Sequence, residues 1–598
     1  MFLATTSNQS YWKKDEKIIF LGEWCKLYNQ KHVWQNLQHE TLPYHWKDRE
    51  KFRQDYFYCE SLYEKLLKQL GEQLNQIHGV DHSQRYWRIV LGSWLFYFIT
   101  AIYDRYFCIK VATDSKLVTN SWLPSFDSGP WVKVNSYDWL IMSNYNENYN
   151  LYLFSRIIQE LKSIPFEIKN EQIPRENFAQ LTFNYDPLKK KTFQFAAFFR
   201  GMVKRLLPLY TSLVPSRYNS IVFAHSYLSK LDLMRLQLSL GQMPYPLISQ
   251  IYCTQSPSNL ETREKLKSFS FENDFESLLN GMIAESIPTC YVEDYTRIDE
   301  MVKEAFPRNS KTIFTANFTF DEGLKFWMAS QLEKGAKLIT SQHGGGYGTH
   351  EWSFFESHEI KISDQYFSWG WKGEDEERGV IPISSGFLNY AKKLFKPKPD
   401  GSILWVTYSW PRYARIHINE VLGPEILSYL DEQECFLSTV SPEVHGLLLL
   451  RLYHVDYGWN ELERWVDIDP TLNLDRGDQT MYQQLNKSRI CISTTNSTVY
   501  LETFAANFPT LLFWNPNVRE VRKSAQPYFD DLRRVGVLHD TPECAAAKLN
   551  KIFKDPMSWW SSPEIQEVKD KFCHKFARTS DELLTQWKEE LLRITVAK

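Results

Sequence analysis

Short apolar runs alternate with amphipathic stretches through the middle and the last third of the chain. This alternation is typical of a parallel sheet flanked by helices. One series predicts buried strands at 220–226, 311–318, 336–342 and 364–371. A second series predicts strands at 402–409 and 446–453, followed by a strand, a polar loop, a helix and a strand within 489–516. We therefore expect an α/β protein whose two doubly wound halves face a cleft, with ligands at the carboxyl ends of the strands.

The segments outside these two series complete a plan of three parts. Residues 372–402 are charged and then rich in proline and lysine, which predicts a linker. The first third of the chain is aromatic-rich and is expected to be mostly helical after an initial strand. We expect a Rossmann-like acceptor-side domain with helical insertions at 1–390, a second Rossmann-like domain at 391–560, and C-terminal helices at 561–598 that could cross back to the first domain.

Composition and charge narrow the functional class. The chain has 598 residues, of which 43% are apolar, and a net charge of −3. A dedicated nucleic-acid-binding protein would normally carry a basic stripe, so we expect no nucleic-acid partner. Aromatic residues make up 15% of the chain, which fits either a sugar-binding cleft or simply a large core.

The cysteine pattern and the N-terminal sequence predict a cytoplasmic protein. The nine cysteines are scattered and include no CxxC pair, as expected of free thiols in a reducing compartment. The N-terminus lacks the basic and apolar regions of a signal peptide. The most apolar run, 89–103, is shorter than the ~20 residues that cross a bilayer, so we interpret it as a buried core helix.

Small hydroxyl residues gather where the strand near 490 ends and a helix begins. A helix N-terminus surrounded by hydroxyl donors can bind a phosphate. Glu502 lies on the first turns of that helix, where a carboxylate can accept both hydroxyls of a ribose. An ordinary N-cap followed by an acid is the alternative. The predicted nucleotide-binding loop consists of Ser493, Thr494, Thr495, Asn496, Ser497 and Thr498.

Arg451 and His454 lie near the carboxyl end of the strand predicted at 446–453. A guanidinium and an imidazole at this edge could hold a phosphate or pyrophosphate. The alternative is an Arg/His pair on the surface with no function.

The segment SQHGGGYG (341–348) follows the strand predicted at 336–342 and places His343 at the active edge of the first sheet. Gly344, Gly345 and Gly346 lack Cβ atoms, which lets a ligand or the facing domain approach the backbone. The spacing matches neither a P-loop nor a dinucleotide fingerprint. A turn needed only for tight packing is the simpler interpretation.

Several acids at the same sheet edge are candidates for a catalytic base or nucleophile. Asp321 and Glu322 come just after the strand predicted at 311–318, and Glu351 follows the glycine segment. A carboxylate there could deprotonate an acceptor hydroxyl, or attack an anomeric carbon if configuration is retained. A helix cap with an acidic first turn explains Asp321 and Glu322 equally well.

The sequence predicts no metal site and no cofactor. Neither Asp467-Ile468-Asp469 nor the acidic run 374–377 ends an apolar strand. A basic and aromatic segment at 189–205 could rest on anionic lipid, although a solvated face over core aromatics is the simpler interpretation. Contact with the cytoplasmic face of a membrane is therefore an open possibility.

Taken together, these blocks resemble a family of transferases encoded in bacterial O-antigen and surface-polysaccharide loci. The likeness covers nearly the whole chain and rests on MFLATT, IIFLGEWC, SQHGGGYG, ISDQYFSWGW, RLYHVDYGW and the STTNST…E block. More distantly, the pattern of Asn496, Ser497, Thr498, Val499 and Glu502 resembles capsule transferases that use CMP-linked Kdo or nonulosonate. There, Asn507-Phe508 replaces the usual Gly-Lys before the proline, and His454-Val455 replaces a His-Pro motif.

The resemblance implies a GT-B fold, a nucleotide-sugar donor and no metal. We expect a glycosyltransferase that builds a surface glycan such as O-antigen, lipopolysaccharide or capsule, with CMP-Kdo or a CMP-nonulosonate as donor and an acceptor that could be lipid-linked. The alternatives are a sugar-nucleotide epimerase or glycerophosphotransferase of the same two-sheet plan, and a non-catalytic glycan-assembly scaffold.

Overall fold

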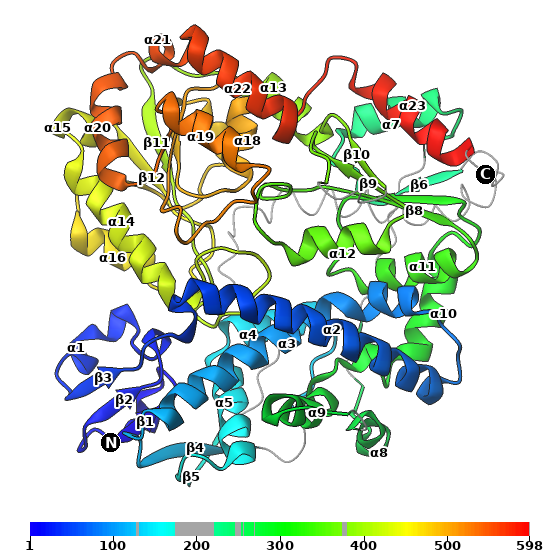
Figure 1. The fold of residues 1–598 in the computed structure, drawn as a ribbon, viewed down its shortest axis with the longest axis vertical. Helices are drawn as coiled ribbons and strands as arrows, with labels where there is room; N and C mark the ends of the chain where they lie inside the picture. The colour runs from blue at the N-terminus through cyan, green and yellow to red at the C-terminus, as the bar shows by residue number, and fades with distance from the viewer. Residues whose placement is uncertain are drawn as a thin grey trace.

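Three parallel sheets with helices packed against them form the described part of the chain (Figure 1). The structure is a computed structural model that describes residues 1–126, 131–173, 220–244, 251–373 except 252, 255, 268 and 269, and 379–596. In Figure 1 the N-terminal sheet lies at the bottom, the second sheet at the upper right and the third at the upper left. The second and third sheets are the two predicted α/β halves, so the predicted fold class is confirmed.

The N-terminal sheet is an element that the sequence analysis missed. Its five strands pair in parallel in the order β3-β2-β1-β4-β5. Three of them have only three residues, too few to show an alternating pattern. The strands are β1 (Phe2–Ala4), β2 (Ile18–Phe20), β3 (His39–Thr41), β4 (Asn120–Phe126) and β5 (Phe166–Ile173).

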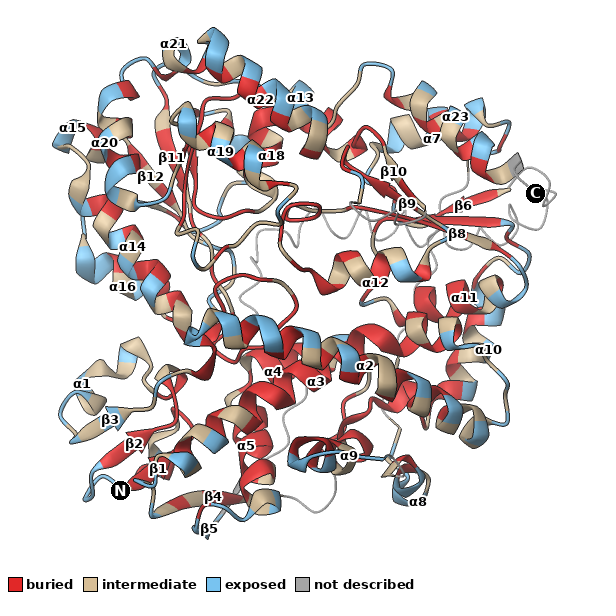
Figure 2. Cartoon of the chain, in the orientation of Figure 1, coloured by how far each residue is buried: buried red, intermediate tan, exposed pale blue. Residues whose placement is uncertain are grey.

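Two long helices, α2 (Arg49–His78) and α3 (Gln84–Asp114), run between the N-terminal sheet and the other two sheets (Figure 1). Asp48 caps α2 and Ser83 caps α3 through their side chains. Residues 89–103 lie in α3 and are buried throughout (Figure 2), which confirms the predicted core helix. Within the described residues, none of the helices is both long and apolar enough to cross a bilayer.

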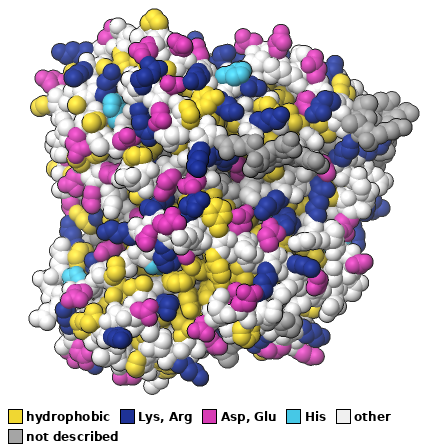
Figure 3. Space-filling view, viewed as in Figure 1, with side chains coloured by type: hydrophobic (Ala, Val, Ile, Leu, Met, Phe, Trp, Pro, Cys, Tyr) yellow, Lys and Arg dark blue, Asp and Glu magenta, His cyan; other side chains and the backbone are white. Residues whose placement is uncertain are grey.

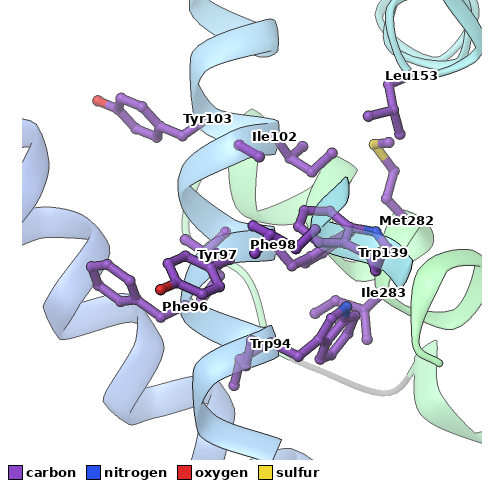
Figure 4. Packing of buried hydrophobic residues seen from close by; sticks show 14 of the residues in the cluster. Trp94, Phe96, Tyr97, Phe98, Ile102, Tyr103, Trp139, Leu153, Met282 and Ile283 are labelled. Carbon is purple, nitrogen blue, oxygen red and sulfur yellow. The ribbon is translucent and has the colours of Figure 1, made fainter. Parts of the chain in front are cut away.

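Aromatic side chains of α3 form the centre of the largest core cluster. Trp94 and Phe98 stack at 5.1 Å between ring centroids, and both pack against Trp139 of α4 (Ser136–Tyr145) (Figure 4). Met282 and Ile283 of α9 (Asp274–Ser286) and Leu153 of α5 (Glu147–Leu161) belong to the same cluster. Much of the aromatic content therefore fills this core.

The second sheet has the order β10-β9-β8-β7-β6, and all of its pairs are parallel. α11 (Glu322–Glu333) and α12 (Phe354–Ile362) contact its central strands, and α11 also packs on α3. α7 (Lys230–Ser239) and the C-terminal helix α23 (Leu583–Val596) share another cluster with the sheet. Its strands are β6 (Ile221–Phe223), β7 (Thr312–Thr315), β8 (Lys337–Ser341), β9 (Gln365–Ser368) and β10 (Val380–Pro382).

The linker predicted at 372–402 contains regular structure instead. β10 adds an edge strand to the second sheet, and α13 (Gly386–Leu394) packs against the third. Leu388 and Ala391 are buried although charged residues surround them in the sequence, which is why the apolar pattern was obscured. The chain enters the third sheet through the short stretch 395–401 and returns to the second sheet between α22 (Pro563–Phe576) and α23.

The third sheet has the order β13-β12-β11-β14-β15-β16, again with parallel pairs. α14 (Ile426–Thr439), α16 (Glu461–Ile468) and α20 (Pro542–Ile552) share one cluster with it. α13, α17 (Met481–Leu485) and α18 (Thr498–Ala505) share another. The strands are β11 (Ser402–Val406), β12 (Leu448–Arg451), β13 (Asn473–Asp475), β14 (Ser488–Ser493), β15 (Thr510–Phe513) and β16 (Leu538–His539).

The remaining helices cover the outside of this framework. They are α1 (Lys31–Trp34), α8 (Leu260–Glu264), α10 (Tyr295–Ala305), α15 (Pro442–His445), α19 (Gln526–Arg534), α21 (Pro556–Trp560) and α22 (Pro563–Phe576). On the face drawn in Figure 3, charged side chains of both signs are interspersed, without a basic stripe. The basic and aromatic segment at 189–205 and the acidic run 374–377 lie outside the described residues.

Candidate functional site

The glycine loop after β8 meets the hydroxyl loop after β14. The backbone N–H of Gly345 donates a hydrogen bond of 2.8 Å to Oγ1 of Thr498, the first residue of α18. A Cβ at position 345 would lie 2.3–2.6 Å from the backbone of Ser497 and Thr498, closer than atoms can approach. Only glycine permits this contact. The structure thus brings together two predicted motifs that are 153 residues apart.

Further contacts fix the glycine loop against the third sheet. Gly346 adopts a φ of +85°, a conformation that favours glycine. His350 Nε2 lies 3.2 Å from the carbonyl oxygen of Asn496, and the Asn496 amide donates to Thr349 Oγ1 at 3.1 Å. These bonds hold the edges of the second and third sheets together. The glycines therefore serve the close approach of the facing domain.

The hydroxyl loop, residues 493–498, is largely buried and bonds to neighbouring elements. Thr494 Oγ1 donates to the carbonyl of Val406 at 3.1 Å and lies 2.6 Å from the Tyr429 hydroxyl. Ser497 is the N-cap residue of α18, but its side chain makes no capping hydrogen bond. The first N–H groups of α18 are thus not capped by this serine, unlike those of most long helices here. The ordinary N-cap interpretation therefore does not describe this loop.

Glu502 lies one turn into α18 and is half-buried. Among the described residues, no hydrogen-bond donor or cation is paired with its carboxylate. Burial raises the pKa of Glu502 to about 7. A partly buried acid without a partner can accept hydrogen bonds from a ligand, as expected for a ribose-binding residue.

Arg451 and His454 are placed less favourably than the sequence predicts. Arg451 at the end of β12 forms an ion pair with Asp475 and donates to the carbonyl of Gln479 at 2.9 Å. Its guanidinium is therefore committed to the strand beside it. His454 is exposed and packs against Tyr453. The structure favours a structural role for Arg451.

His343 lies at the carboxyl edge of the second sheet in an aromatic surrounding. Its ring is near Tyr347, Phe355 and Tyr227, with centroids 5.4–6.4 Å away. Nδ1 lies 3.4 Å from Oε1 of Glu359, a fully buried acid of α12 that also accepts from the Tyr347 hydroxyl at 3.1 Å. Burial lowers the pKa of His343 to about 4, so the ring is neutral at pH 7.

Asp321 is the N-cap of α11 at the same edge of the second sheet. One carboxylate oxygen accepts from the backbone N–H of Leu324 at 2.9 Å. Burial still raises the pKa of Asp321 above its ordinary value, more than this hydrogen bond lowers it. The exposed His225, at the end of β6, also acts on this pKa. Asp321 is thus both a helix cap and a candidate base.

Glu322 and Glu351 occupy other surroundings. Glu322 is buried, accepts bonds from Ser136 and the Tyr291 hydroxyl, and lies 2.9 Å from the Lys325 ammonium. The hydrogen bonds of its carboxylate join three elements: α4, the turn Thr289–Tyr291 before α10, and α11. Glu351 forms a part-exposed ion pair with Arg53 of α2. The structure therefore favours structural roles for both residues and leaves Asp321 as the base candidate.

Two further features near His343 were not singled out by the sequence analysis. Glu359 is one of several acids in this part of the sequence, and only the folded α12 shows which of them faces the ring. The segment 407–422 follows β11 and runs between the sheets, where His417 stacks on Trp410 at 4.9 Å and lies against Phe355. The sequence could have indicated that this segment is functional, because arginines and a histidine follow a predicted strand.

One group of metal-ligand type occurs among the described residues. It consists of His45, which precedes α2, and of Asp104 and Cys108 of α3, and all three are buried. Asp104 already accepts from the Tyr44 hydroxyl and pairs with Arg105. This group belongs to the core rather than to the cleft.

A comparison with models of protein families gives a match over nearly the whole chain. The family model described as LIC12162 family transferase matches residues 1–591. No curated protein matches the chain at a significant level.

Solved structures resemble the chain only weakly. An α,α-trehalose-phosphate synthase (UDP-forming) from Burkholderia vietnamiensis is 11% identical over 56% of this chain and 82% of its own, with a TM-score of 0.31. Anabaena Alr3699/HepE in complex with UDP-glucose is 8% identical over 54% and 90%, with a TM-score of 0.33. At these values the likeness carries no statement about ligands.

Proposed function

This chain belongs to the LIC12162 family of transferases, and from that premise we propose that it is a glycosyltransferase using a nucleotide-sugar donor. The donor lies in the cleft between the second and third sheets. The nucleotide lies against the hydroxyl loop and Glu502, and the sugar faces the edge that carries His343 and Asp321.

The observation that carries this proposal is the junction of Gly345 with Thr498. Two N–H-rich loops meet here at the carboxyl ends of two parallel sheets, beside a helix start that its N-cap serine leaves uncapped. Backbone N–H groups and the positive end of a helix dipole bind phosphate. Glu502 on the same helix supplies an acceptor for the ribose hydroxyls.

The transfer requires a base and a leaving group. The acceptor hydroxyl oxygen bonds to the anomeric carbon, and the bond from that carbon to the donor phosphate oxygen breaks. Asp321 takes the hydroxyl proton, and the nucleotide leaves with the bonding electron pair. His343, held by Glu359 and Tyr347, contacts the sugar or its phosphate. This scheme needs no metal or other cofactor.

The donor we propose is CMP-Kdo or a CMP-nonulosonate, and the acceptor is a bacterial surface glycan. This choice rests on the resemblance of the Asn496–Val499 and Glu502 pattern to CMP-sugar transferases. In this proposal the reaction takes place in the cytoplasm, and the acceptor is presented at the inner membrane.

Nucleotide binding tests the proposal directly. We expect CMP to raise the thermal unfolding midpoint, by mass action on the folded state, more than UDP or GDP does. Incubation with CMP-Kdo and a glycan acceptor should then release CMP. Conversion of a nucleotide sugar without acceptor would favour an epimerase, and no stabilisation by any nucleotide would favour a scaffold.

His343 separates binding from chemistry. We expect His343→Gln to lower kcat by ~10²–10³-fold, the range for losing one hydrogen bond that stabilises charge in the transition state, with little change in the Kd for nucleotide. The matched control is His32→Gln, which alters an exposed histidine of α1 and should leave both kcat and the Kd for nucleotide unchanged. A large loss of nucleotide affinity in His343→Gln, with kcat retained, would assign the phosphate to the glycine loop.

A further inference from the structure

Arg519 is a buried arginine whose two terminal nitrogens have no hydrogen-bond partner. It lies in the loop after β15 and is 3% exposed. Its Nε donates to Glu420 Oε2 at 2.7 Å, whereas Nη1 and Nη2 have no partner in the described chain. A buried N–H without an acceptor costs folding free energy, so this arrangement calls for a ligand.

The surroundings of Arg519 are the carboxyl ends of β11 and β14. Its guanidinium lies 5.2 Å from the ring centroid of Tyr429 and 5.9 Å from that of Tyr408. The Tyr429 hydroxyl is 2.6 Å from Thr494 Oγ1, so the Tyr429 side chain links Arg519 to the hydroxyl loop. The Tyr408 hydroxyl and the Ser409 hydroxyl are also buried and lack partners.

Arg519 is also connected to the glycine loop. Glu420, its ion-pair partner, lies 3.8 Å from His350 Nε2, and the same nitrogen is 3.2 Å from the carbonyl of Asn496. Arg519 is thus linked to the hydroxyl loop through Glu420 and His350.

We propose that Arg519 binds a phosphate of the nucleotide donor through Nη1 and Nη2. This inference rests on the proposed function and names the cation of its phosphate site. A guanidinium fork with two free donors matches the tetrahedral oxygens of a phosphate. Arg451, the cation expected from the sequence, is bonded to Asp475 and Gln479 instead.

The test compares a nucleotide with its nucleoside. Titration calorimetry with CMP and with cytidine measures the contribution of the phosphate in each variant. We expect Arg519→Met to weaken CMP by 10- to 100-fold and to leave cytidine within about twofold. Arg519→Lys keeps the positive charge and loses the fork. Its CMP affinity should therefore lie between those of the wild-type protein and Arg519→Met.

A matched control is available in α8, far from the hydroxyl loop in the sequence. Arg263 is 2% exposed, but all its guanidinium nitrogens are bonded, to Glu293 and to the carbonyls of Ala284 and Ile287. Arg263→Met should lower the thermal midpoint without changing CMP affinity. The same measurement of the thermal midpoint shows whether the Arg519 variants are folded. If Arg519→Met is unfolded, Arg519→Lys still tests the proposal, because lysine preserves the ion pair with Glu420.

Each outcome decides between the two proposals. If wild-type protein binds CMP and both Arg519 variants bind it equally well, this inference is wrong and the proposed function stands. An equal loss of CMP and cytidine affinity also overturns it, because the arginine would then support the site as a whole. If wild-type protein binds none of CMP, CDP, UDP and GDP, both proposals fall.

Discussion

At the residue scale, Asp321 combines a structural and a chemical task that one substitution can separate. Asparagine caps helices as well as aspartate does, so Asp321→Asn should keep α11 intact and remove only the base. We expect kcat to fall by ~10²–10⁴-fold while the thermal midpoint stays within a degree or two (about 0.5 kcal/mol or less). Enzyme turnover and thermal unfolding, measured on the same preparation, check this.

Asp555→Asn is the matched control, since Asp555 caps α21 in the same way, outside the cleft. It should change neither turnover nor stability. Normal turnover in Asp321→Asn would remove Asp321 from the chemistry and leave Glu351, whose Oε1 alone is paired with Arg53, as the remaining predicted acid.

Glu502 gives a pH-dependent prediction at the same scale. Its folded pKa of about 7 exceeds the unfolded value of ~4.3, so the folded state binds a proton more tightly. The carboxyl therefore costs stability increasingly as pH rises from ~4.3 through 7. Glu502→Gln should raise the thermal midpoint relative to wild type at pH 8 but not at pH 4, and should weaken nucleotide binding at pH 8, where the wild-type carboxyl is ionised. A midpoint difference that does not grow with pH would contradict the raised pKa.

How far the sequence predicts this site differs from residue to residue. The hydroxyl loop and the glycine loop could be found because backbone geometry demands small residues in a recognisable order. The partners of a side chain could not, because they come from distant elements: Glu322 is occupied by Ser136 and Tyr291, and Arg451 by Asp475. Glu359 and Arg519 became candidates only when their neighbours in space were known.

At the element scale, the contact between the glycine loop and α18 depends on one missing methyl group. Gly345→Ala would force a Cβ to within 2.3–2.6 Å of backbone atoms that cannot move independently. We expect the variant to lose ~1–3 kcal/mol of stability, typical of overpacking, and to bind nucleotide more weakly. Gly281→Ala in α9 is the control, because a Cβ there meets no atom within 4 Å. Equal behaviour of the two variants would mean that the loops are not in contact.

The same scale explains which elements the sequence predicts. Buried parallel strands such as β7 and β8 have apolar centres, and each lies inside its predicted range. The three-residue strands of the N-terminal sheet leave no such pattern, and β10 with α13 is hidden among charges. Short elements are defined by the neighbours that complete their sheet, which a local pattern does not contain.

At the scale of the whole molecule, the segment 407–422 connects the third sheet to the core cluster around α3. It leaves β11 and inserts Tyr413, Ala414 and Ile416 into the core cluster built around α3. The buried Arg105 of α3 donates to the carbonyls of Ala414 and Ser143, and Arg415 donates to Asn144 at 2.6 Å. The two sides of the cleft are therefore connected by a packed core as well as by the chain at 395–401.

This connection predicts that the cleft does not close by a large hinge motion. Separating or rotating the third sheet would pull buried aromatic and arginine side chains out of a close-packed core. We expect small-angle scattering to give the same radius of gyration with and without saturating CMP. Arg105→Met removes the bonds to Ala414 and Ser143 and should lower the thermal midpoint of the whole chain in a single transition. Compaction of the wild-type protein on adding CMP would show instead that the segment releases the third sheet when the donor binds.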